Sequence, residues 1–525
     1  MREVDVLVVG SGVAGLTAAL AASLKGAEVA VMEKSAYIGG TSAMSGGVLW
    51  IPANRHMVSA GLADTGAEGL RYLERVTMGR VPIPVLSDYI DSAAGMLEFL
   101  EANTSLEFVS RSDHPDYLPE SLGGRLGRGV QPKEWDPSPL AQAFELIRRS
   151  PSGWKEDLPD VEKPTPRRTF VSFGRALVGG LLFACLRNGV HVQTASPVVD
   201  LWFDNGRTRG VWIEHDAHRS KIGARCGVVL ASGGFEWNQE LVDTFLSVPL
   251  TMPVSSPSNT GDGLRMVMRA GAALANMGEA WWTPAIHIDG ESYEDGPLNR
   301  FITGERSKPG SLMVNRRGRR FVRESMNYND IARAMAAFDP LGCEYPNLPC
   351  FLIFDARYRE SYSVAGITPA DPTPRWMHES GSIDVLAARL GIDAVGLNCQ
   401  IREFNMHAGR GVDLAFGRGS DLYDRYAGDP VVGVNPTLRP LGRGPYYGIE
   451  LHIGALGTKG GPRIDRCGRV LDFGGAPIPG LYAAGNVTGS VMGPSYPGPG
   501  ATLGPAATYG MKAGTTVVDD ANFRS

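Results

Sequence analysis

The N-terminal stretch constrains the fold of this chain more than any other part of the sequence. Residues 4–9 form an apolar run of strand length, and the glycine-rich segment 10–15 follows at once and opens a helix rich in alanine and leucine. Residues 28–33 then have the pattern of a second strand, which ends on the acid Glu33. A strand, the spacing G-x-G-x-x-G, a helix, a strand and an acid in this order predict a βαβ unit that binds a dinucleotide.

The glycines and the acid each have a chemical role in such a unit. Glycines let the backbone approach a pyrophosphate at the helix N-terminus. Glu33 can accept hydrogen bonds from ribose hydroxyls, and its charge disfavours a 2′-phosphate. A second glycine-rich loop, residues 39–47, follows soon after the acid. We interpret this second loop as a sign of FAD rather than NAD, because FAD passes its pyrophosphate and ribityl chain along this edge.

Length and composition limit the other possibilities. The chain has 525 residues, which is enough for roughly two to four domains, and its net charge of −5 argues against nucleic acid as a partner. The cysteines show neither a C-x-x-C motif nor metal-ligand spacing with histidines, so we expect reduced, mostly buried thiols and no metal site. The N-terminus enters a strand without a signal peptide, and no apolar run approaches the roughly 18 residues of a spanning helix. We therefore expect a cytoplasmic protein, and we leave peripheral membrane contact and oligomeric state open.

The patterns change along the chain and then return. Residues 65–103 alternate polar and apolar side chains at helical spacing, which predicts a helical pair. Residues 151–166 are rich in proline and charge and predict a surface excursion, to which we assign no role. From about Trp282 the pattern becomes one of mixed strands and proline loops, and it returns to the first type after Leu451.

The predicted fold is therefore of the α/β (α+β) class. A Rossmann-like FAD-binding domain is discontinuous and consists of residues 1–285 and 452–525, with an inserted α+β catalytic domain over residues 286–451. Within the first segment, residues 259–263 predict a helix cap that places Asp262 in the first helical turn.

A glycine- and proline-rich loop near the C-terminal end is the second organising feature. Residues 480–486 are a short apolar strand with glycines, and the following loop carries Tyr496 and Gly500 before a helix begins at small residues. Such a loop leaves backbone amides pointing outward, which favours a site for an anion or for the edge of a ring.

The loop after the βαβ unit carries a family resemblance. Residues 33–47, with the pattern Glu-Lys-x4-Gly-Gly-Thr-Ser-x-x-Ser-Gly-Gly, resemble the FAD-binding loop of the fumarate reductase and 3-ketosteroid dehydrogenase superfamily. Succinate dehydrogenases of that superfamily attach flavin through a histidine in this loop. No histidine occurs between Glu33 and Ile51, so the resemblance implies noncovalent FAD.

Two positions choose between branches of the superfamily. Fumarate reductases place a histidine where this chain has Gly457 and an arginine in the final loop where it has Tyr496. A dicarboxylate needs such cations, so a neutral, mainly apolar substrate fits better. The segments 457–461, 480–486 and 496–506 are more similar to those of 3-ketosteroid Δ1-dehydrogenases.

The resemblance implies roles for individual residues. Tyr328 would be the base that removes a proton at C2 of a 3-ketosteroid, assisted by a hydrogen bond from Tyr117. The Tyr496 hydroxyl and the Gly500 amide would hold the C3 oxygen, and FAD N5 would take the hydride from C1. Making tyrosinate at pH 7 costs about 4 kcal/mol, so we expect Tyr117 and nearby positive charge to lower this cost and activity to rise into mildly alkaline pH.

The motifs and the resemblance together assign a set of residues to the flavin. They are Gly10, Gly12, Val13, Ala14, Gly15, Glu33, Lys34, Gly39, Gly40, Thr41, Ser42, Gly46, Gly47, Ser232, Gly233, Asp262, Gly485, Asn486, Thr502 and Leu503.

One block of basic residues remains. The segment 314–324 resembles a hairpin whose second strand leads toward the flavin, and it contains five arginines, at 316, 317, 319, 320 and 323. We interpret this block as a solvated turn, because it is too short and isolated for a nucleic-acid surface.

The sequence thus favours desaturation of ring A of a 3-ketosteroid, with electrons passed to an external acceptor such as a quinone. Alternatives are a ketosteroid Δ4-(5α)-dehydrogenase or a desaturase of another cyclic ketone. A fumarate-reductase-like enzyme and a flavin-binding module without catalysis are disfavoured, the latter because mere FAD retention would not need three tyrosines.

Overall fold

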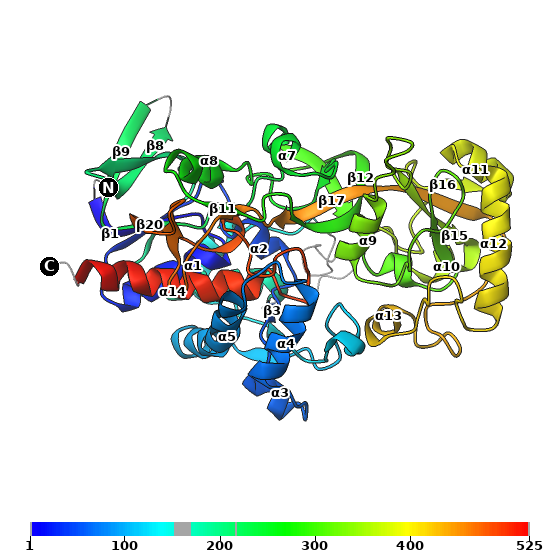
Figure 1. The fold of residues 1–525 in the computed structure, drawn as a ribbon, viewed down its shortest axis with the longest axis horizontal. Coiled ribbons are helices and arrows are strands. Elements are labelled where there is room, and N and C mark those ends of the chain that lie inside the picture. Colours follow the sequence, from blue (N-terminus) through cyan, green and yellow to red (C-terminus); the bar gives the residue numbers. More distant parts are fainter. Residues whose placement is uncertain (1–2, 152–169, 216–217, 523–525) are drawn as a thin grey trace.

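The computed structural model describes residues 3–151, 170–215 and 218–522. Both ends of the chain lie in one half of the molecule, and the middle of the chain forms most of the other half (Figure 1). The long strands β12 (Ala280–Tyr293) and β17 (Tyr446–Thr458) run from the first half into the second (Figure 1).

The first sheet holds the predicted βαβ unit. Strand β1 (Glu3–Val9) pairs in parallel with β2 (Val29–Met32) on one side and with β9 on the other. From Val6 to Val9 its residues are apolar and buried on both faces, because helices and further strands cover them. The sheet order is β19-β20-β9-β1-β2-β6, with β7 and β8 paired beside β9. Its other strands are β6 (His191–Gln193), β7 (Val198–Asp204), β8 (Arg207–His215), β9 (His218–Leu230), β19 (Arg469–Leu471) and β20 (Pro477–Ala483).

The C-terminal helix packs on the helix of the βαβ unit. Helix α14 (Leu503–Asn522) lies against α1 (Val13–Leu24) (Figure 1). The close approach requires glycine, since a Cβ on Gly514 would lie 2.1 Å from the carbonyl oxygen of Ala18. The end of the chain is thereby built into the nucleotide-binding half.

The predicted helical pair is confirmed. It consists of α4 (Gly66–Val76) and α5 (Ile83–Asn103), which pack on each other and beside α14. A three-stranded sheet lies next to them, with β3 (Leu49–Trp50), β4 (Phe108–Ser110) and β5 (Gly129–Pro132) in the order β3-β5-β4. The remaining helices of this half are α2 (Gly40–Met44), α3 (Arg55–Ser59), α6 (Phe173–Arg187), α7 (Gln239–Phe245) and α8 (Asp262–Arg269).

The second sheet is built on β12 and β17. Its order is β13-β12-β17-β15-β14, with β10 and β16 also paired to β17. The other strands are β10 (Met252–Pro253), β13 (Gly296–Phe301), β14 (Ser311–Val314), β15 (Cys350–Asp355) and β16 (His378–Ser380), and a separate pair joins β11 (Leu274–Ala275) to β18 (Gly461–Pro462). The helices are α9 (Tyr328–Met335), α10 (Ala356–Ser361), α11 (Ile383–Leu390), α12 (Ala394–Gly409) and α13 (Leu422–Ala427).

The α/β fold class is confirmed, since strands from both ends of the chain belong to one sheet that packs with helices. The predicted boundaries at 285/286 and 451/452 fall inside β12 and β17, so the division into domains stays a prediction. Most of the proline-rich excursion 151–166 lies outside the described residues. Within the described part of the chain, no helix is long and apolar enough to cross a bilayer.

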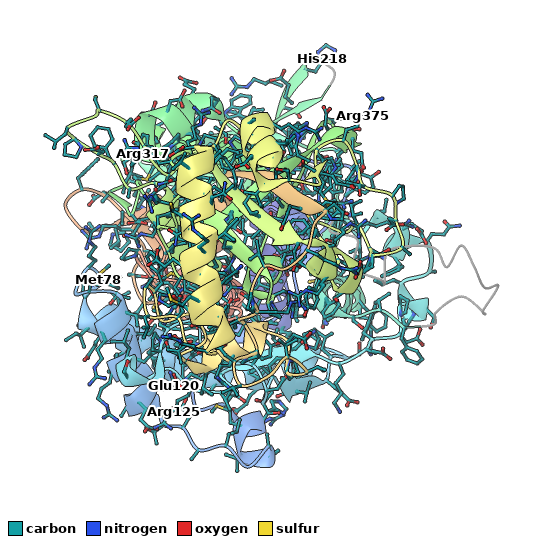
Figure 2. The ribbon with its side chains drawn as sticks, turned by 90° about the vertical axis from the view of Figure 1, so that its right-hand side faces the viewer. Met78, Glu120, Arg125, His218, Arg317 and Arg375 are labelled. Carbon is teal, nitrogen blue, oxygen red and sulfur yellow. The ribbon has the colours of Figure 1, made fainter. Side chains whose placement is uncertain are left out.

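The arginine block differs from its prediction. Strand β14 ends at Val314, and the described residues 315–327 form turns and loop without a second strand. Glu324 points inward, where it accepts hydrogen bonds from the side chain of Arg320 and the amide of Met313. Arg317 is at the surface, as Figure 2 shows, but Arg320 is buried and binds the carboxylates of Glu324 and Asp413. The prediction of a solvated turn is therefore wrong for Arg320.

The cysteines also differ in part from their prediction. All six are free thiols, as expected, but only Cys185 and Cys350 are buried. The other four are exposed or half-buried, so the expectation of mostly buried thiols is wrong.

Candidate active site

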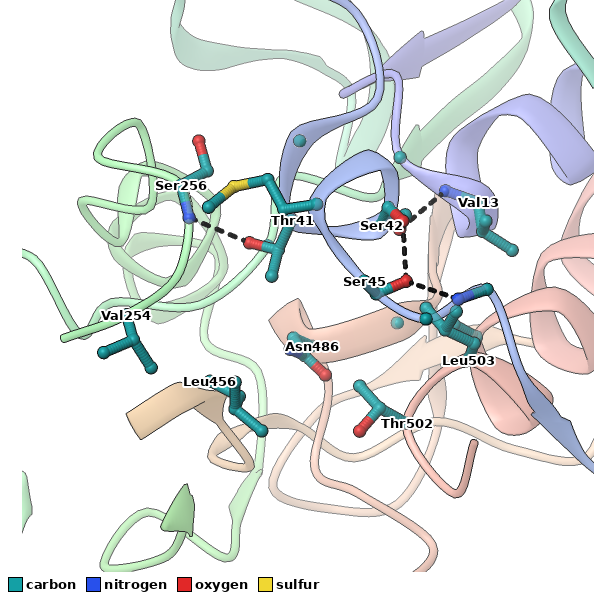
Figure 3. A pocket seen from close by; sticks show the side chains of 18 of the residues that line it. Val13, Thr41, Ser42, Ser45, Val254, Ser256, Leu456, Asn486, Thr502 and Leu503 are labelled. Carbon is teal, nitrogen blue, oxygen red and sulfur yellow. Dashed lines mark hydrogen bonds between the residues drawn. The ribbon is translucent and has the colours of Figure 1, made fainter. Parts of the chain in front are cut away.

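A cavity of about 700 Å³ is lined by both halves of the molecule. One end is formed by the turn after β1, the loop 40–48 and the start of α14. Figure 3 shows this end, where Ser42, Ser45, Asn486 and Leu503 come together from segments far apart in the sequence. The other end is lined by residues from β13, α9 and α13.

The turn after β1 leaves room only for glycine. Gly10 has φ +102°, and a Cβ there would lie 2.4 Å from the carbonyl oxygen of Ala231. A Cβ on Gly15 would lie 2.0 Å from the carbonyl oxygen of Gly10, so this glycine brings helix α1 against the turn. The Gly12 cap residue makes no side-chain hydrogen bond to the helix N-terminus. The Val13 amide donates to Ser42, but no acceptor for the amides of Ala14 and Gly15 is found among the described residues, so the helix start still offers backbone donors to a pyrophosphate.

Glu33 is held in place at the end of β2. Its carboxylate accepts hydrogen bonds from the amide and the hydroxyl of Ser11, at 3.0 and 2.6 Å, and from the amide of Ser35 at 2.9 Å. The Ser11 hydroxyl in turn accepts from the amide of Gly39 at 2.9 Å. This network fixes the acid at the cavity wall, where ribose hydroxyls would reach it.

The second glycine-rich loop is tied to both neighbouring segments. Ser42 accepts from the Val13 amide at 3.1 Å, and Thr41 accepts from the Ser256 amide at 3.1 Å (Figure 3). Lys34 and Asp262 also line the cavity, but they bind each other at 2.7 Å.

The cavity wall also contains a buried donor without a partner. The Ser232 hydroxyl is buried and finds no hydrogen-bond partner among the described residues. A helix N-terminus with free backbone amides, a fixed acid and an unpaired hydroxyl match the polar groups of FAD. The residues present therefore fit this cofactor.

The glycine contact predicts the first testable result. We expect Gly15→Ala to lose most of its bound FAD and to melt at a lower temperature, because the new methyl group forces α1 away from the turn. Gly95→Ala in α5 is the matched control, since nothing lies within 4 Å of its Cβ position and alanine favours a helix. The flavin-to-protein absorbance ratio and the thermal midpoint measure both. Equal FAD content in the two variants would contradict the assignment of the turn.

Three tyrosines from distant segments meet at the other end. The hydroxyls of Tyr117 and Tyr328 are 3.1 Å apart, and both rings pack on Tyr496, with centroids 5.1 and 5.4 Å away. All three are less than a tenth exposed and line the cavity. The resemblance had named these three, and tertiary contacts bring them together.

The backbone of Tyr117 joins the two other tyrosine segments. Its amide donates to the carbonyl of Pro497 at 2.9 Å, next to Tyr496. Its carbonyl accepts from the side chain of Asn327 at 3.3 Å, next to Tyr328. Asn327 also caps α9, so Tyr328 sits in the first turn of a helix. Tyr117 thus fixes the spacing of the whole cluster.

Two cations hold the loop that precedes Tyr496. Lys459 donates to the Ser495 carbonyl at 2.9 Å, and Arg333 donates to the Pro494 carbonyl at 3.0 Å. Lys459 is fully buried, and its ammonium lies 4.2 Å from the ring centroid of Trp281, which packs on Tyr496. Burial lowers the pKa of Lys459 to about 7.

The Gly500 amide faces the same space. Gly500 has φ +89°, and a Cβ there would lie 2.5 Å from the carbonyl oxygen of Val48. Its own carbonyl accepts from the amides of Trp50 and Gly504, but no acceptor for its amide is found in the described part of the chain. A free amide beside a phenol can serve as a two-donor site for an oxygen.

Burial raises the pKa values of the three tyrosines, whereas we expected from the sequence that neighbouring groups would lower that of Tyr328. It raises the pKa of Tyr328 and of Tyr117 well above the ordinary value, and it raises the pKa of Tyr496 as well. After burial, the largest contributions to the raised pKa of Tyr328 come from the two other phenols, Tyr117 and Tyr496. The expectation that surrounding groups lower the pKa of Tyr328 is therefore wrong.

The cavity contains nearly all of the residues predicted for it. Of the predicted set, only Gly15 and Gly39 lie behind the wall, where they shape the turn and the network of Ser11. Sequence reasoning missed Tyr423 of α13, whose ring centroid is 5.1 Å from that of Tyr117, and it gave no role to Asn259 or Arg300 in the lining. Tyr423 follows the helix cap Asp421, but no motif marks it.

Comparisons with known proteins agree with this geometry. Residues 5–503 match the family model of an FAD binding domain. The chain is 40% identical to 4-oxocyclohexanecarboxylate 2-dehydrogenase of Sinomonas cyclohexanicum over 98% of this chain and 93% of the relative. It is 37% identical to 3-oxosteroid 1-dehydrogenase of Mycobacterium tuberculosis, over 100% of both chains.

A solved structure is similar to this chain over nearly its whole length. The crystal structure of 3-ketosteroid delta1-dehydrogenase from Sterolibacterium denitrificans in complex with 1,4-androstadiene-3,17-dione matches with a TM-score of 0.91 and 33% identity, covering 99% of this chain and 100% of that chain. The match spans both halves of the molecule. The chain therefore belongs to the FAD-binding oxidoreductase family of the 3-oxosteroid 1-dehydrogenases, and its cofactor is FAD.

Proposed function

We propose that the protein is an FAD-dependent 3-ketosteroid Δ1-dehydrogenase, which removes hydrogens from C1 and C2 of ring A. The observation that carries this proposal is the meeting of Tyr117, Tyr328, Tyr496 and the free Gly500 amide in the cavity that also holds the flavin-binding turn. The relatives named 3-oxosteroid 1-dehydrogenase support it across the whole chain.

Each polar group has one task in this reaction. The Tyr496 hydroxyl and the Gly500 amide donate to the C3 oxygen, which gains negative charge when the neighbouring carbon loses its proton. Tyr328 takes that proton from C2, and Tyr117, hydrogen-bonded to it at 3.1 Å, holds the phenol in position. Bound FAD supplies the acceptor for the hydride from C1 at its N5 atom. We further propose that an external acceptor such as a quinone reoxidises the flavin.

The structure adds a reason against the fumarate-reductase alternative. A Cβ on Gly457 would lie 2.3 Å from the side-chain nitrogen of Asn486, and the side-chain oxygen of the same residue accepts a hydrogen bond from the indole of Trp281. A histidine at this position would displace both neighbours. The groups that would hold a dicarboxylate at the reacting end are therefore absent from positions 457 and 496.

A second candidate differs only in the substrate. The relative named 4-oxocyclohexanecarboxylate 2-dehydrogenase is 40% identical to the chain, so a monocyclic ketone is a reasonable substrate for the same chemistry. In both candidates a proton leaves a carbon beside a ketone and a hydride leaves the next carbon.

One anaerobic experiment tests the proposal. The FAD-loaded protein is mixed with 4-androstene-3,17-dione or with 4-oxocyclohexanecarboxylate, and flavin bleaching and the product are followed. Bleaching with formation of the 1,4-diene supports the steroid reaction. Bleaching only with the monocyclic ketone selects the second candidate, and bleaching only with ring-saturated steroids indicates Δ4 chemistry. If dithionite-reduced flavin is oxidised by fumarate and no ketone reacts, the proposal is wrong.

The acidity of Tyr328 predicts the pH dependence. Since burial raises the pKa of this phenol above about 10, the tyrosinate fraction increases with pH over the whole range up to that value. We expect the rate of flavin reduction at saturating ketone to rise close to tenfold per pH unit from about pH 7 to about pH 10, without a plateau. Deuterium at C2 of the substrate checks that proton removal limits the rate. A flat profile under that condition would count against Tyr328 as base.

A further inference from the structure

The outer part of the cavity carries an unbalanced positive charge. Three cations line it, Arg111, Arg300 and Lys308. Among the described lining residues, the only carboxylates are Glu33 and Asp262 at the flavin end, and their partners are Ser11, Ser35 and Lys34. The chain as a whole has a net charge of −5, so this local excess does not follow from composition.

Contacts place Arg300 and Lys308 beside the tyrosine cluster. They belong to one segment, 300–308, and the buried Arg306 ties this segment to the backbone before Tyr328 by donating to the carbonyls of Glu324 and Met326. Lys308 donates to the carbonyl of Gly428 at 2.7 Å, just after α13.

Arg111 lies in the segment before Tyr117, and it contacts the same helix, α13. Its guanidinium donates to the hydroxyl of Tyr426 at 3.0 Å and to the side chain of Gln131 at 2.9 Å, and it lies 3.6 Å from the carboxylate of Asp113. Arg111 is therefore better compensated than Arg300 and Lys308.

The ring of Tyr426 packs on His114 with centroids 4.3 Å apart. His114 lies 6.0 Å from the ring of Tyr117. Burial lowers the pKa of His114 to about 4, so this ring is neutral and the positive charge comes from the arginines and the lysine.

Arg300 and Lys308 are only partly satisfied by the protein. Arg300 donates to the carbonyl of Ala365, its nearest carboxylate is Glu291 at 4.0 Å, and its buried Nε has no partner in the described residues. Lys308 makes one hydrogen bond to a carbonyl. The carboxylates of Asp429 and Glu305 act on its charge, but neither forms an ion pair with it within 4.0 Å among the described residues. Burial lowers the pKa of both groups. A desolvated cation without a counter-ion is stabilised when an anion binds.

A buried arginine of the same region, Arg418, has several protein partners. Arg418 is fully buried and donates to the carbonyls of Ser311, Arg306 and Lys308, and it lies 3.4 Å from the carboxylate of Glu324. It is not part of the cavity wall. A cation can therefore stabilise this part of the fold without lining the cavity, whereas Arg300 and Lys308 line it.

We propose that Arg300 and Lys308, assisted by Arg111, bind a carboxylate carried by the substrate away from its ketone. This inference rests on the proposed function and narrows its substrate class to cyclic keto acids. It does not conflict with Gly457 and Tyr496, which exclude a carboxylate only at the reacting end. The substrate carboxylate is attached either to a single oxocyclohexane ring or to the end of a steroid opposite ring A.

Two pairs of ketones distinguish these sources. The first pair is 4-oxocyclohexanecarboxylate and its methyl ester, and the second is 3-oxo-4-androstene-17β-carboxylate and its methyl ester. For each pair, the ratio of kcat/KM for acid to ester is measured with the FAD-loaded parent, Arg300→Met, Lys308→Met and the surface control Arg317→Met. We expect the parent to prefer the acid of one pair, and Arg300→Met and Lys308→Met to lower that ratio roughly tenfold or more. Arg317→Met should keep the ratio of the parent.

Calorimetric binding of the two acids to the oxidised holoenzyme gives a readout that is independent of turnover. If an acid binds the parent and binds Arg300→Met and Lys308→Met at least tenfold more weakly, the subsite stands even where no ketone bleaches the flavin, and only the proposed reaction fails. The subsite is overturned if neither acid binds the parent, or if the variants lower acid and ester to the same extent. Lys308→Met keeps the test valid if Arg300→Met proves unstable.

Discussion

Replacing Tyr328 by phenylalanine is expected to slow flavin reduction by a ketone roughly 10³-fold, while the protein keeps its FAD and its fold. The ring would still pack edge-on against Tyr496 and Tyr117, because only the hydroxyl is removed. That hydroxyl is bound to Tyr117, and its loss costs about 1 kcal/mol of stability. The large effect on rate would therefore report the missing base and not a damaged site.

Anaerobic stopped-flow absorbance of the flavin measures this rate directly. Tyr482→Phe is the matched control, because Tyr482 is a buried tyrosine of β20 whose hydroxyl binds Asp520 outside the cavity. We expect this control to reduce its flavin at the parental rate. If Tyr328→Phe, fully loaded with FAD, were as fast as the control, the assignment of the base would have to be given up.

Replacing Tyr496 by phenylalanine should slow the same step about 10²- to 10³-fold, the effect of losing one of two donors to a developing oxyanion. The Gly500 amide remains in the variant, and this explains why some activity should survive. The loss should appear in kcat more than in KM, since the donor acts on charge that develops during the reaction.

The loop geometry allows this second experiment to be interpreted. Lys459 and Arg333 hold the carbonyls before Tyr496, and Tyr72 and Tyr117 hold the carbonyl of Pro497 after it. None of these contacts uses the Tyr496 hydroxyl. The Tyr496 hydroxyl itself accepts a hydrogen bond of 3.4 Å from Thr502, so its loss should lower the melting temperature only slightly, and the flavin content of the variant should stay close to that of the parent. A change confined to KM would show that the hydroxyl binds the ketone without stabilising the enolate.

Local patterns were sufficient to predict the flavin end of the cavity. The spacing of Gly10, Gly12 and Gly15 between a strand and a helix reflects a turn made within a few residues, in which a Cβ on Gly15 would lie 2.0 Å from the carbonyl oxygen of Gly10. The helical pair and the first-turn position of Asp262 followed from periodicity and capping in the same way.

Predictions failed where a side chain finds its partner far along the chain. Arg320 looks like part of a solvated arginine run, but Asp413 provides its second carboxylate from a distant loop. Tyr423 has no motif and reaches the cluster only because α13 packs beside Tyr117. The pKa of Tyr328 was misjudged for the same reason, since burial and the two other phenols, which come from distant segments, raise it.

The sequence by itself determined that this chain binds FAD in a strand–glycine turn–helix unit, because the turn, the helix start and the acid are neighbours in the chain. It also named the three tyrosines, through resemblance. Folding was needed to show that their rings meet, that burial raises their pKa values, and that Arg111, Arg300 and Lys308 line the outer cavity with no carboxylate beside them among its described lining residues. Burial and charge compensation depend on groups brought together by folding, and no local pattern records them.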